Sequence, residues 1–100
     1  MPKGYWIAHG DVTNPEGYKE YVALNAKAFS KYGGKFLVRG GAFTLKHGTA
    51  RARHVVIEFE SYQKALACYE SAEYRAAEIV RNKHSQGDVI VIEGYDGPQP

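Results

Sequence analysis

His9 and Asp11 form a candidate proton-transfer pair near the start of the chain, in the segment YWIAHGDV. Side chains two residues apart in a strand point to the same face. A carboxylate beside an imidazole can orient it as a general base, so the pair is suited to moving a proton. The alternative is structural: a partly exposed histidine near a strand end, followed by an aspartate that starts the turn into a helix.

Arg39 and Glu58 form a second candidate pair, because they come from two strands that we expect to be neighbours. An arginine fork can hold a carboxylate or enolate oxygen, and a half-buried glutamate can act as a base. The alternative is an ion pair that only sets register and specificity. We predict His9, Glu58 and Arg39 as catalytic residues. The predicted pocket or interface residues are Asp11, Leu37, His54 and Val56.

The spacing of the metal-binding residue types predicts neither a metal site nor a cofactor. The four histidines (His9, His47, His54 and His84) do not stand at intervals typical of metal ligands, and there is one cysteine, Cys68. Convergence of the histidines in space stays open. Cys68 lies in an amphipathic segment with no activating partner in sight, so we expect it to be a core residue and not a nucleophile.

Composition indicates one ordinary globular domain. The chain has 100 residues, of which 44% are hydrophobic and 24% charged. We expect a single domain over 1–100, with its core at about 4–95 and a tail at 96–100. The net charge of +2 is too small for a protein that binds nucleic acid through phosphates. One cysteine, and no apolar run typical of a signal peptide or membrane span, lead us to expect a cytoplasmic protein without a membrane partner.

The pattern of apolar and turn-forming residues predicts four strands and the helices between them. Strands are expected at 5–12, 35–41, 52–60 and 88–95. A helix capped by Thr13 or Asn14 and ended by Gly33 should separate the first two. Helical segments should follow Ser61 and Ser71, with a break near Ser71. The β-α-β-β-α-β order predicts an α+β, ferredoxin-like sandwich with an antiparallel sheet and the helices on one face.

The glycines beside the second strand predict structural roles. Gly33 and Gly34 follow a helix and do not open one, so they do not form a phosphate-binding loop. Gly40 and Gly41 indicate a bulge or a close backbone approach that leaves room beside Arg39.

Strand alternation assigns the side chains to the two faces of the sheet. The residues expected under the helices are Trp6, Ala8, Phe36, Val38, Val55, Ile57, Phe59, Ile90 and Ile92. The opposite face mixes apolar residues with His9, Arg39 and Glu58, and it is too apolar to stay bare on a monomer. We therefore predict a homodimer through these faces, with a cavity for a small-molecule ligand.

Nucleic acid is not an expected partner, although RNA-recognition domains share this order of elements. Those domains stack bases on aromatic residues of the open face of the third strand. Here His54, Val56 and Glu58 are expected at that place.

Four segments carry a resemblance to a known family: GYWIAHGDVTNPEGYKEY, KYGGKFLVRGG, RHVVIEFESYQKALACYESAEY and GDVIVIEGY. They resemble the bacterial family called domain of unknown function 1330, from about Gly4 to Tyr95. The resemblance implies a ferredoxin-like protomer and a dimeric α/β-barrel in which two sheets pack face to face. More distantly, the chain resembles small barrels that include cofactor-free monooxygenases, muconolactone isomerases, and EthD-like and YciI-like proteins. The family implies no agreed reaction.

Two functions fit these residues. The first is a cofactor-independent enzyme for a small aromatic or carbonyl-bearing metabolite, in which Arg39 holds an oxyanion or carboxylate and His9 or Glu58 moves a proton. The second is a non-catalytic small-ligand-binding or accessory module that uses the same dimer cavity. The sequence does not separate the two.

Overall fold

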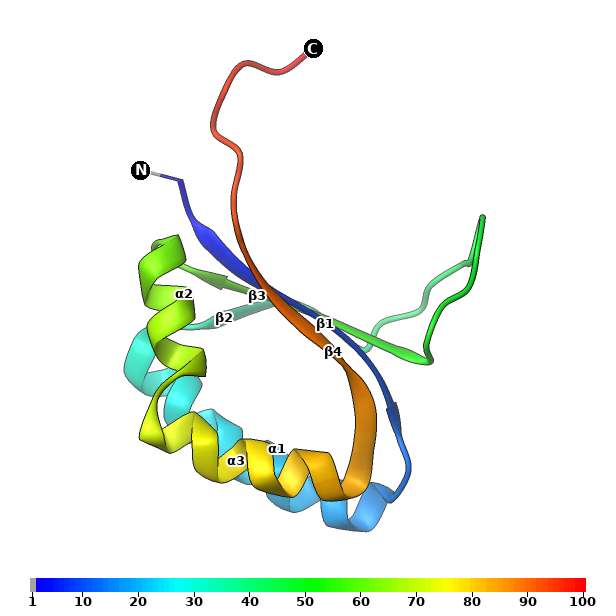
Figure 1. Ribbon diagram of the computed structural model, residues 1–100. Coiled ribbons are helices and arrows are strands. Elements are labelled where there is room, and N and C mark those ends of the chain that lie inside the picture. The colour runs from blue at the N-terminus through cyan, green and yellow to red at the C-terminus, as the bar shows by residue number, and fades with distance from the viewer. Residues whose placement is uncertain (1) are drawn as a thin grey trace.

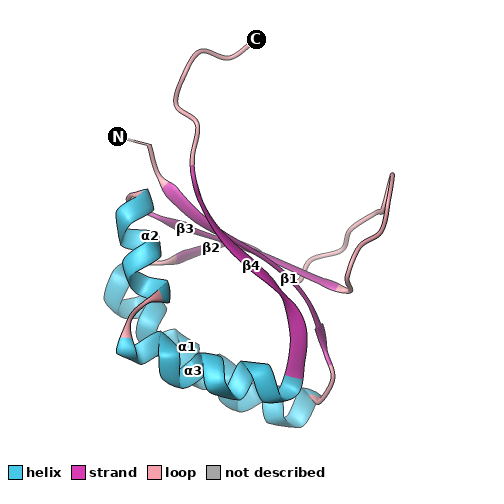
Figure 2. Cartoon of the chain, in the orientation of Figure 1, coloured by secondary structure: helices cyan, strands magenta, loops and turns pink. Residues whose placement is uncertain are grey.

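The computed structural model describes residues 2–100, which form a twisted sheet with helices on one face (Figure 1, Figure 2). The strands are β1 (Gly4–Val12), β2 (Lys35–Arg39), β3 (Arg53–Phe59) and β4 (Ser85–Glu93), and the helices are α1 (Pro15–Tyr32), α2 (Tyr62–Tyr69) and α3 (Ala72–His84). The sheet order is β2-β3-β1-β4, and each neighbouring pair is antiparallel. The predicted ferredoxin-like sandwich is confirmed.

The helix ends lie where the sequence signals predict them. The Asn14 side chain accepts a hydrogen bond from the Gly17 amide at the start of α1, and Gly33 ends the helix with a left-handed φ of 74°. Ser61 and Ser71 cap α2 and α3 in the same way. The second cap separates the two helices and confirms the predicted break.

Trp6 is the centre of the core between the helices and the sheet. Its side chain is 2% exposed, and its ring meets Tyr74 at 4.8 Å and Phe29 at 5.0 Å between centroids, both edge to face. Its indole N–H donates to the Ala65 carbonyl at 2.8 Å. Burial and edge-to-face packing of such rings are favourable, so Trp6 holds α1, α2 and α3 against β1.

The predicted face assignment of β4 is wrong. Val89 and Val91 pack against the core, whereas Ile90 and Ile92 are 50% and 44% exposed. The β1–β4 register places Val91 opposite buried Trp6. Alternation could not decide this strand, because residues 89–92 are all apolar and the polar residues that flank them, Asp88 and Glu93, fall on opposite faces.

A bulge in β2 overturns two further assignments. Phe36 pairs with Ile57 and Val38 with Val56, so Leu37 is an extra residue in the strand. Val38 therefore lies on the face away from the helices, and Arg39 pairs with Val55 on the helix face. The Arg39 guanidinium lies 4.1 Å from the centre of the Phe36 ring. One inserted residue moves every later side chain to the opposite face. The expected bulge at Gly40 and Gly41 thus occurs earlier, at Leu37.

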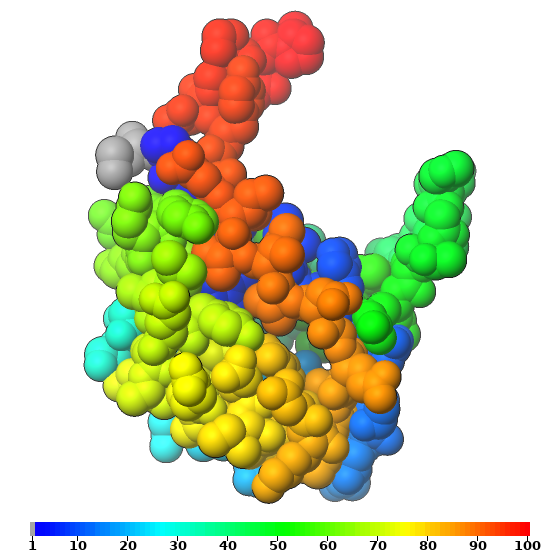
Figure 3. Space-filling model, viewed as in Figure 1, coloured from blue at the N-terminus to red at the C-terminus, as the bar shows by residue number. Residues whose placement is uncertain are grey.

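The face away from the helices is here called the open face. Its residues are Tyr5, Ile7, His9, Val38, His54, Val56, Glu58, Asp88, Ile90 and Ile92, as the strand registers show. Residues 40–52 join β2 to β3 as a projecting arm, seen in green in Figure 3, with Phe43 and Leu45 each 51% exposed. Among residues 2–100, no helix is both long enough and apolar enough to cross a membrane.

Candidate functional site

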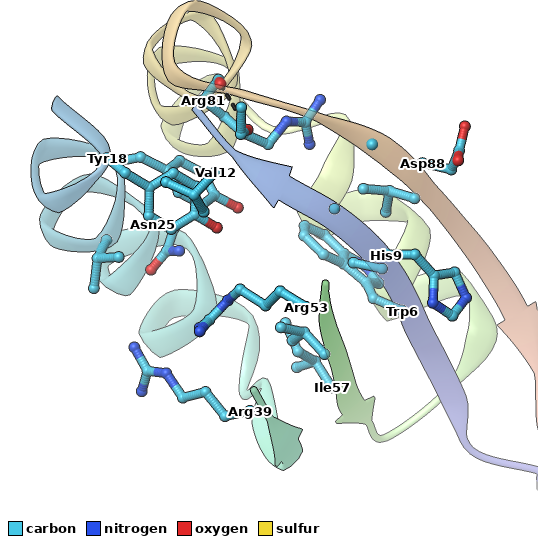
Figure 4. Close-up of a pocket in the computed structure, with 18 of the residues that line it drawn as sticks. Trp6, His9, Val12, Tyr18, Asn25, Arg39, Arg53, Ile57, Arg81 and Asp88 are labelled. Carbon is cyan, nitrogen blue, oxygen red and sulfur yellow. Dashed lines mark hydrogen bonds between the residues drawn. The ribbon is translucent and has the colours of Figure 1, made fainter. Parts of the chain in front are cut away.

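A cavity of about 90 Å³, here called the helix-face cavity, lies between the helices and the sheet (Figure 4). Its apolar wall comes from Trp6, Ala8, Phe29, Phe36, Val55 and Ile57. Its polar lining includes Tyr18, Tyr21, Asn25, Arg39, Arg53, Tyr74 and Arg81, together with His9 and Asp11 of β1 and Asp88 of β4. An apolar wall with a few convergent polar groups is typical of a small-molecule site.

Two arginines bring positive charge into the helix-face cavity without forming ion pairs of their own among residues 2–100. Arg53 alternates with Val55 and Ile57 along β3, so it faces the helices, and its buried Nε has no hydrogen-bond partner among residues 2–100. In the same part of the chain, neither Arg39 nor Arg53 forms an ion pair, whereas Arg81 lies 3.5 Å from Glu78. A buried guanidinium nitrogen without a partner is costly, and a carboxylate or enolate oxygen would satisfy it.

Three hydroxyl-bearing and basic side chains form a hydrogen-bonded chain at the helix side of the cavity. The Tyr21 and Tyr74 hydroxyl oxygens are 2.8 Å apart, and Arg81 Nη1 donates to the Tyr74 oxygen at 2.8 Å. Burial raises the pKa of Tyr74, and the neighbouring Tyr21 adds to the rise. The phenol therefore stays protonated at neutral pH and acts as a hydrogen-bond donor.

Tyr18 adds a further hydroxyl to the cavity. Burial raises the pKa of the Tyr18 hydroxyl and Tyr21 adds to the rise, while Arg53 and Arg81 oppose it. The amide of Asn25, a residue 6% exposed, completes the polar wall. These groups can stabilise a negatively charged oxygen but are poor bases at neutral pH.

His9 lies on the open face, where it contacts a predicted interface residue. Its Nδ1 is 2.8 Å from Nδ1 of His54, directly opposite on β3. In Figure 4 the His9 ring lies on the other side of β1 from Arg53 and Tyr18. Asp11 does not orient it: the Asp11 carboxylate accepts hydrogen bonds from Arg51 Nη1 at 2.8 Å and from the Ala52 amide at 2.9 Å.

The expected pairing of Arg39 with Glu58 is wrong, because the β2 bulge puts the two side chains on opposite faces. Glu58 accepts a hydrogen bond from the Tyr5 hydroxyl at 3.2 Å and lies 3.9 Å from Lys3 Nζ. It shares the open face with His9 but sits four residues further along the strands, which corresponds to about 13 Å. The three predicted catalytic residues therefore do not converge.

The other predicted residues lie near the centre and edge of the sheet. Val56 is on the open face opposite Ile7, and Leu37 is the extra residue of β2, 50% exposed. Cys68 is fully buried, and burial raises the pKa of its thiol to about 12, so its predicted role as a core residue is confirmed.

Sequence reasoning expected a ligand cavity at the open face, between two copies of the chain, and missed Arg53 in the helix-face cavity. The signal was present: in RHVVIEF, Arg53 has the same parity as Val55, Ile57 and Phe59, which were expected under the helices. An arginine on the covered face of a sheet needs a partner there. Tyr18, Tyr21 and Asn25 lie along one mostly aromatic face of α1, a pattern more typical of a core than of a binding site.

The strand order, register and helix placement define the fold as ferredoxin-like. Residues 3–95 match the family described as domain of unknown function (DUF1330), and the chain belongs to that family.

Solved structures show the same fold at low sequence identity. The protein of unknown function RPA0582 from Rhodopseudomonas palustris is 14% identical with a TM-score of 0.72, over 96% of this chain and 85% of that one. SnoaB, a cofactor-independent oxygenase from Streptomyces nogalater, is 12% identical with a TM-score of 0.61, over 100% and 97%. A dimeric ferredoxin-like protein of unknown function from Thermobifida fusca is 16% identical with a TM-score of 0.53, over 92% and 89%. No functionally curated protein matches the chain.

Proposed function

We propose that this chain binds a small aromatic or carbonyl-bearing metabolite with an anionic oxygen in the helix-face cavity, and that it acts on it without a cofactor. The observation that carries the proposal is the buried, unpartnered Nε of Arg53 inside an aromatic-walled cavity. The rings of Trp6, Phe29 and Phe36 suit a planar apolar group. The guanidinium groups of Arg53 and Arg39 suit its carboxylate or enolate.

The proposed chemistry is stabilisation of an oxyanion. As a carbonyl compound loses a proton beside the carbonyl, negative charge develops on its oxygen, and fixed donors at that point lower the barrier. Arg53 is the charged donor, with Tyr21 and Asn25 beside it in the wall. SnoaB, which shares the fold, is described as a cofactor-independent oxygenase, and this supports an enzyme of that general type.

A non-catalytic binding module is the second candidate, and one observation favours it. His9, Asp11 and Asp88 also line the cavity, but in Figure 4 the His9 and Asp88 side chains lie across β1 and β4 from its hydroxyls, amide and guanidiniums. A site whose possible bases lie apart from its donors is complete for binding an anion and poorly arranged for removing a proton from a weak acid.

The site is tested by thermal denaturation with benzoate, salicylate, phenylpyruvate and neutral benzamide. We expect carboxylates to raise Tm, since a ligand at a hundred times its Kd stabilises by about 2.7 kcal/mol. Arg53→Gln should abolish the response. Arg75→Gln, which changes an exposed arginine of α3, should keep it. An equal response in Arg53→Gln, with folding verified by circular dichroism, would contradict the proposed site.

The two candidate functions are separated by turnover. The compounds that shift Tm are incubated aerobically with the protein, and the products are followed by mass spectrometry. Products that form with wild type and Arg75→Gln but not with Arg53→Gln support the enzyme. Binding without any product supports the non-catalytic module.

We further propose that two copies form a homodimer through the open face. Val38, Ile90 and Ile92 are 42–50% exposed there, and together with Ile7 and Val56 they make an apolar surface. Such a surface is typical of an interface. The Thermobifida fusca structure with this fold is described as dimeric, which supports the same arrangement here. A cytoplasmic setting, consistent with one buried thiol, is part of the proposal.

A further inference from the structure

Three side chains stand in a row across the open face at the end where β3 begins. His9 of β1 is directly opposite His54 of β3 on one side and Asp88 of β4 on the other. Together with Thr49, Ala50 and Arg51 of the arm, they line a second hollow, which shares His9 and Asp88 with the helix-face cavity. We propose that His9 and His54 bind a divalent transition-metal ion that favours square or octahedral coordination, such as Cu²⁺ or Ni²⁺.

The separation of the two imidazoles suits this type of ion. Their Nδ1 atoms are 2.8 Å apart, and the ring planes are inclined by 73°. Two nitrogens bound to one ion at about 2.0–2.1 Å lie about 2.9 Å apart when their bonds form a right angle, and about 3.4 Å apart at a tetrahedral angle. The observed distance fits the right angle of tetragonal Cu²⁺ or Ni²⁺ sites better than tetrahedral Zn²⁺.

The His54 ring is held in place and offers a single nitrogen to an ion. Phe43 packs edge to face against it, with 4.5 Å between centroids. Its Nε2 is buried and has no hydrogen-bond partner among residues 2–100, so Nδ1 is the nitrogen directed at His9. In the metal-free pair, one Nδ1 must carry a proton to bond to the other. An ion would replace that proton and accept both lone pairs.

Asp88 is the nearest candidate for a third ligand from the chain. Its side chain is 75% exposed, and its carboxylate lies 3.6 Å from Arg51 Nε. As the side chains stand, no three His, Cys, Asp or Glu residues among 2–100 converge on one point. The proposed site therefore has two protein ligands plus water, and rotation of Asp88 away from Arg51 adds a third. Arg51, which also binds Asp11 at 2.8 Å, places a positive charge beside the ion and opposes its binding.

The test is calorimetric titration of Cu²⁺ and Ni²⁺ into the tag-free, metal-free protein, with electron paramagnetic resonance of the Cu²⁺ form. We expect one ion per chain and a signal from two equivalent imidazole nitrogens. Removing an outer-shell partner alone costs 10- to 100-fold in affinity, so His9→Gln and His54→Gln should each weaken binding at least about tenfold. His47→Gln, in the exposed arm, is the matched control and should bind as wild type does.

Two further variants test the surrounding charges. Arg51→Gln should tighten binding, since it removes the opposing charge, and Asp88→Asn should weaken it less than either histidine variant does. Arg53→Gln, in the helix-face cavity, should leave metal affinity unchanged, so the outcome does not depend on the proposed function. Wild-type affinity in folded His9→Gln, or equal losses in His47→Gln and His9→Gln, would overturn the site.

Discussion

Arg53 is the residue whose surroundings say most about what this chain binds. A guanidinium on the covered face of a sheet loses hydrogen bonds to water, and a protein or ligand partner must replace them. Arg81, in the same cavity, has such partners in Tyr74 and Glu78. Arg53 has no such acidic partner among residues 2–100. An anionic oxygen from a ligand would give Arg53 the acidic partner that Arg81 already has in Glu78.

Tyr74→Phe tests the hydrogen-bonded chain behind the cavity. The substitution removes the oxygen that accepts from Arg81 and leaves the buried Tyr21 hydroxyl without its partner. Bonds to charged groups contribute about 1.5–3 kcal/mol, so we expect the free energy of unfolding to fall by about 2 kcal/mol. Urea denaturation measures the change. Tyr95→Phe, at an exposed position, should change stability by less than about 0.5 kcal/mol.

The positions of single residues could be predicted from the sequence in some cases and not in others. Cys68 could be placed in the core because it lies in an amphipathic helical segment, and Trp6 was placed there correctly although the alternation in its strand is less regular. Arg39 could not be placed correctly, because one inserted residue, Leu37, reversed its face. His9 and His54 are 45 residues apart in the chain, and only the strand register brings them to 2.8 Å. Chemistry that depends on register is not visible in residue spacing.

At the scale of elements, the end of β2 and the start of β3 shape the cavity. Gly40 follows Arg39 with a φ of 67°, and a Cβ there would come 2.5 Å from Nη1 of Arg53. The glycine pair was expected to leave room beside Arg39, whereas the space at Gly40 is taken by the guanidinium of Arg53. Gly41 has open space around it.

Gly40→Ala should therefore be costly, and Gly41→Ala should not. A left-handed φ costs a non-glycine residue about 1–2 kcal/mol, and the new methyl group would also displace Arg53. We expect Gly40→Ala to lower the free energy of unfolding by about 1 kcal/mol or more and to reduce the Tm response to benzoate. Equal stabilities of the two variants in urea would contradict this account of the strand end.

Asp11 ties the arm to β1, and its bonds should depend on pH. The Ala52 amide, then Arg51, lowers the pKa of the Asp11 carboxyl below its ordinary value of 3.8. A lowered folded-state pKa means that the stabilisation is present above the unfolded value and is lost as pH falls through the folded value. The Ala52 amide proton, followed by NMR, should titrate with a midpoint below 3.8. Arg51→Gln should raise that midpoint, and a midpoint at or above 3.8 in wild type would refute the tie.

Element order was the most predictable level of the structure. Caps at Asn14, Ser61 and Ser71 and the glycine at 33 marked the helix ends, and the β-α-β-β-α-β order limited the fold to one arrangement. The face of β4 was not predictable, because Val89, Ile90, Val91 and Ile92 are all apolar. The proposed dimer explains that pattern, since both faces of the strand would then be covered.

At the scale of the whole molecule, the open face predicts self-association. Ile90→Glu places a charge at the centre of the proposed interface, where burying it unpaired would be costly. We expect wild type to sediment as a dimer at micromolar concentration and Ile90→Glu as a monomer. Ile79→Glu, which changes an isoleucine of α3 that is 55% exposed, should remain dimeric. A monomeric wild type would refute the dimer and would leave the proposed ligand site in the helix-face cavity unaffected.

The most direct test of the central claim is a crystal structure of the protein soaked with 4-bromobenzoate, whose bromine is located by anomalous scattering. We expect the bromine to lie against the aromatic wall formed by Trp6, Phe29 and Phe36, with the carboxylate within hydrogen-bond distance of Arg53. Bromobenzoate found instead on the open face, beside His9 or between two sheets, with the helix-face cavity empty, would contradict the claim.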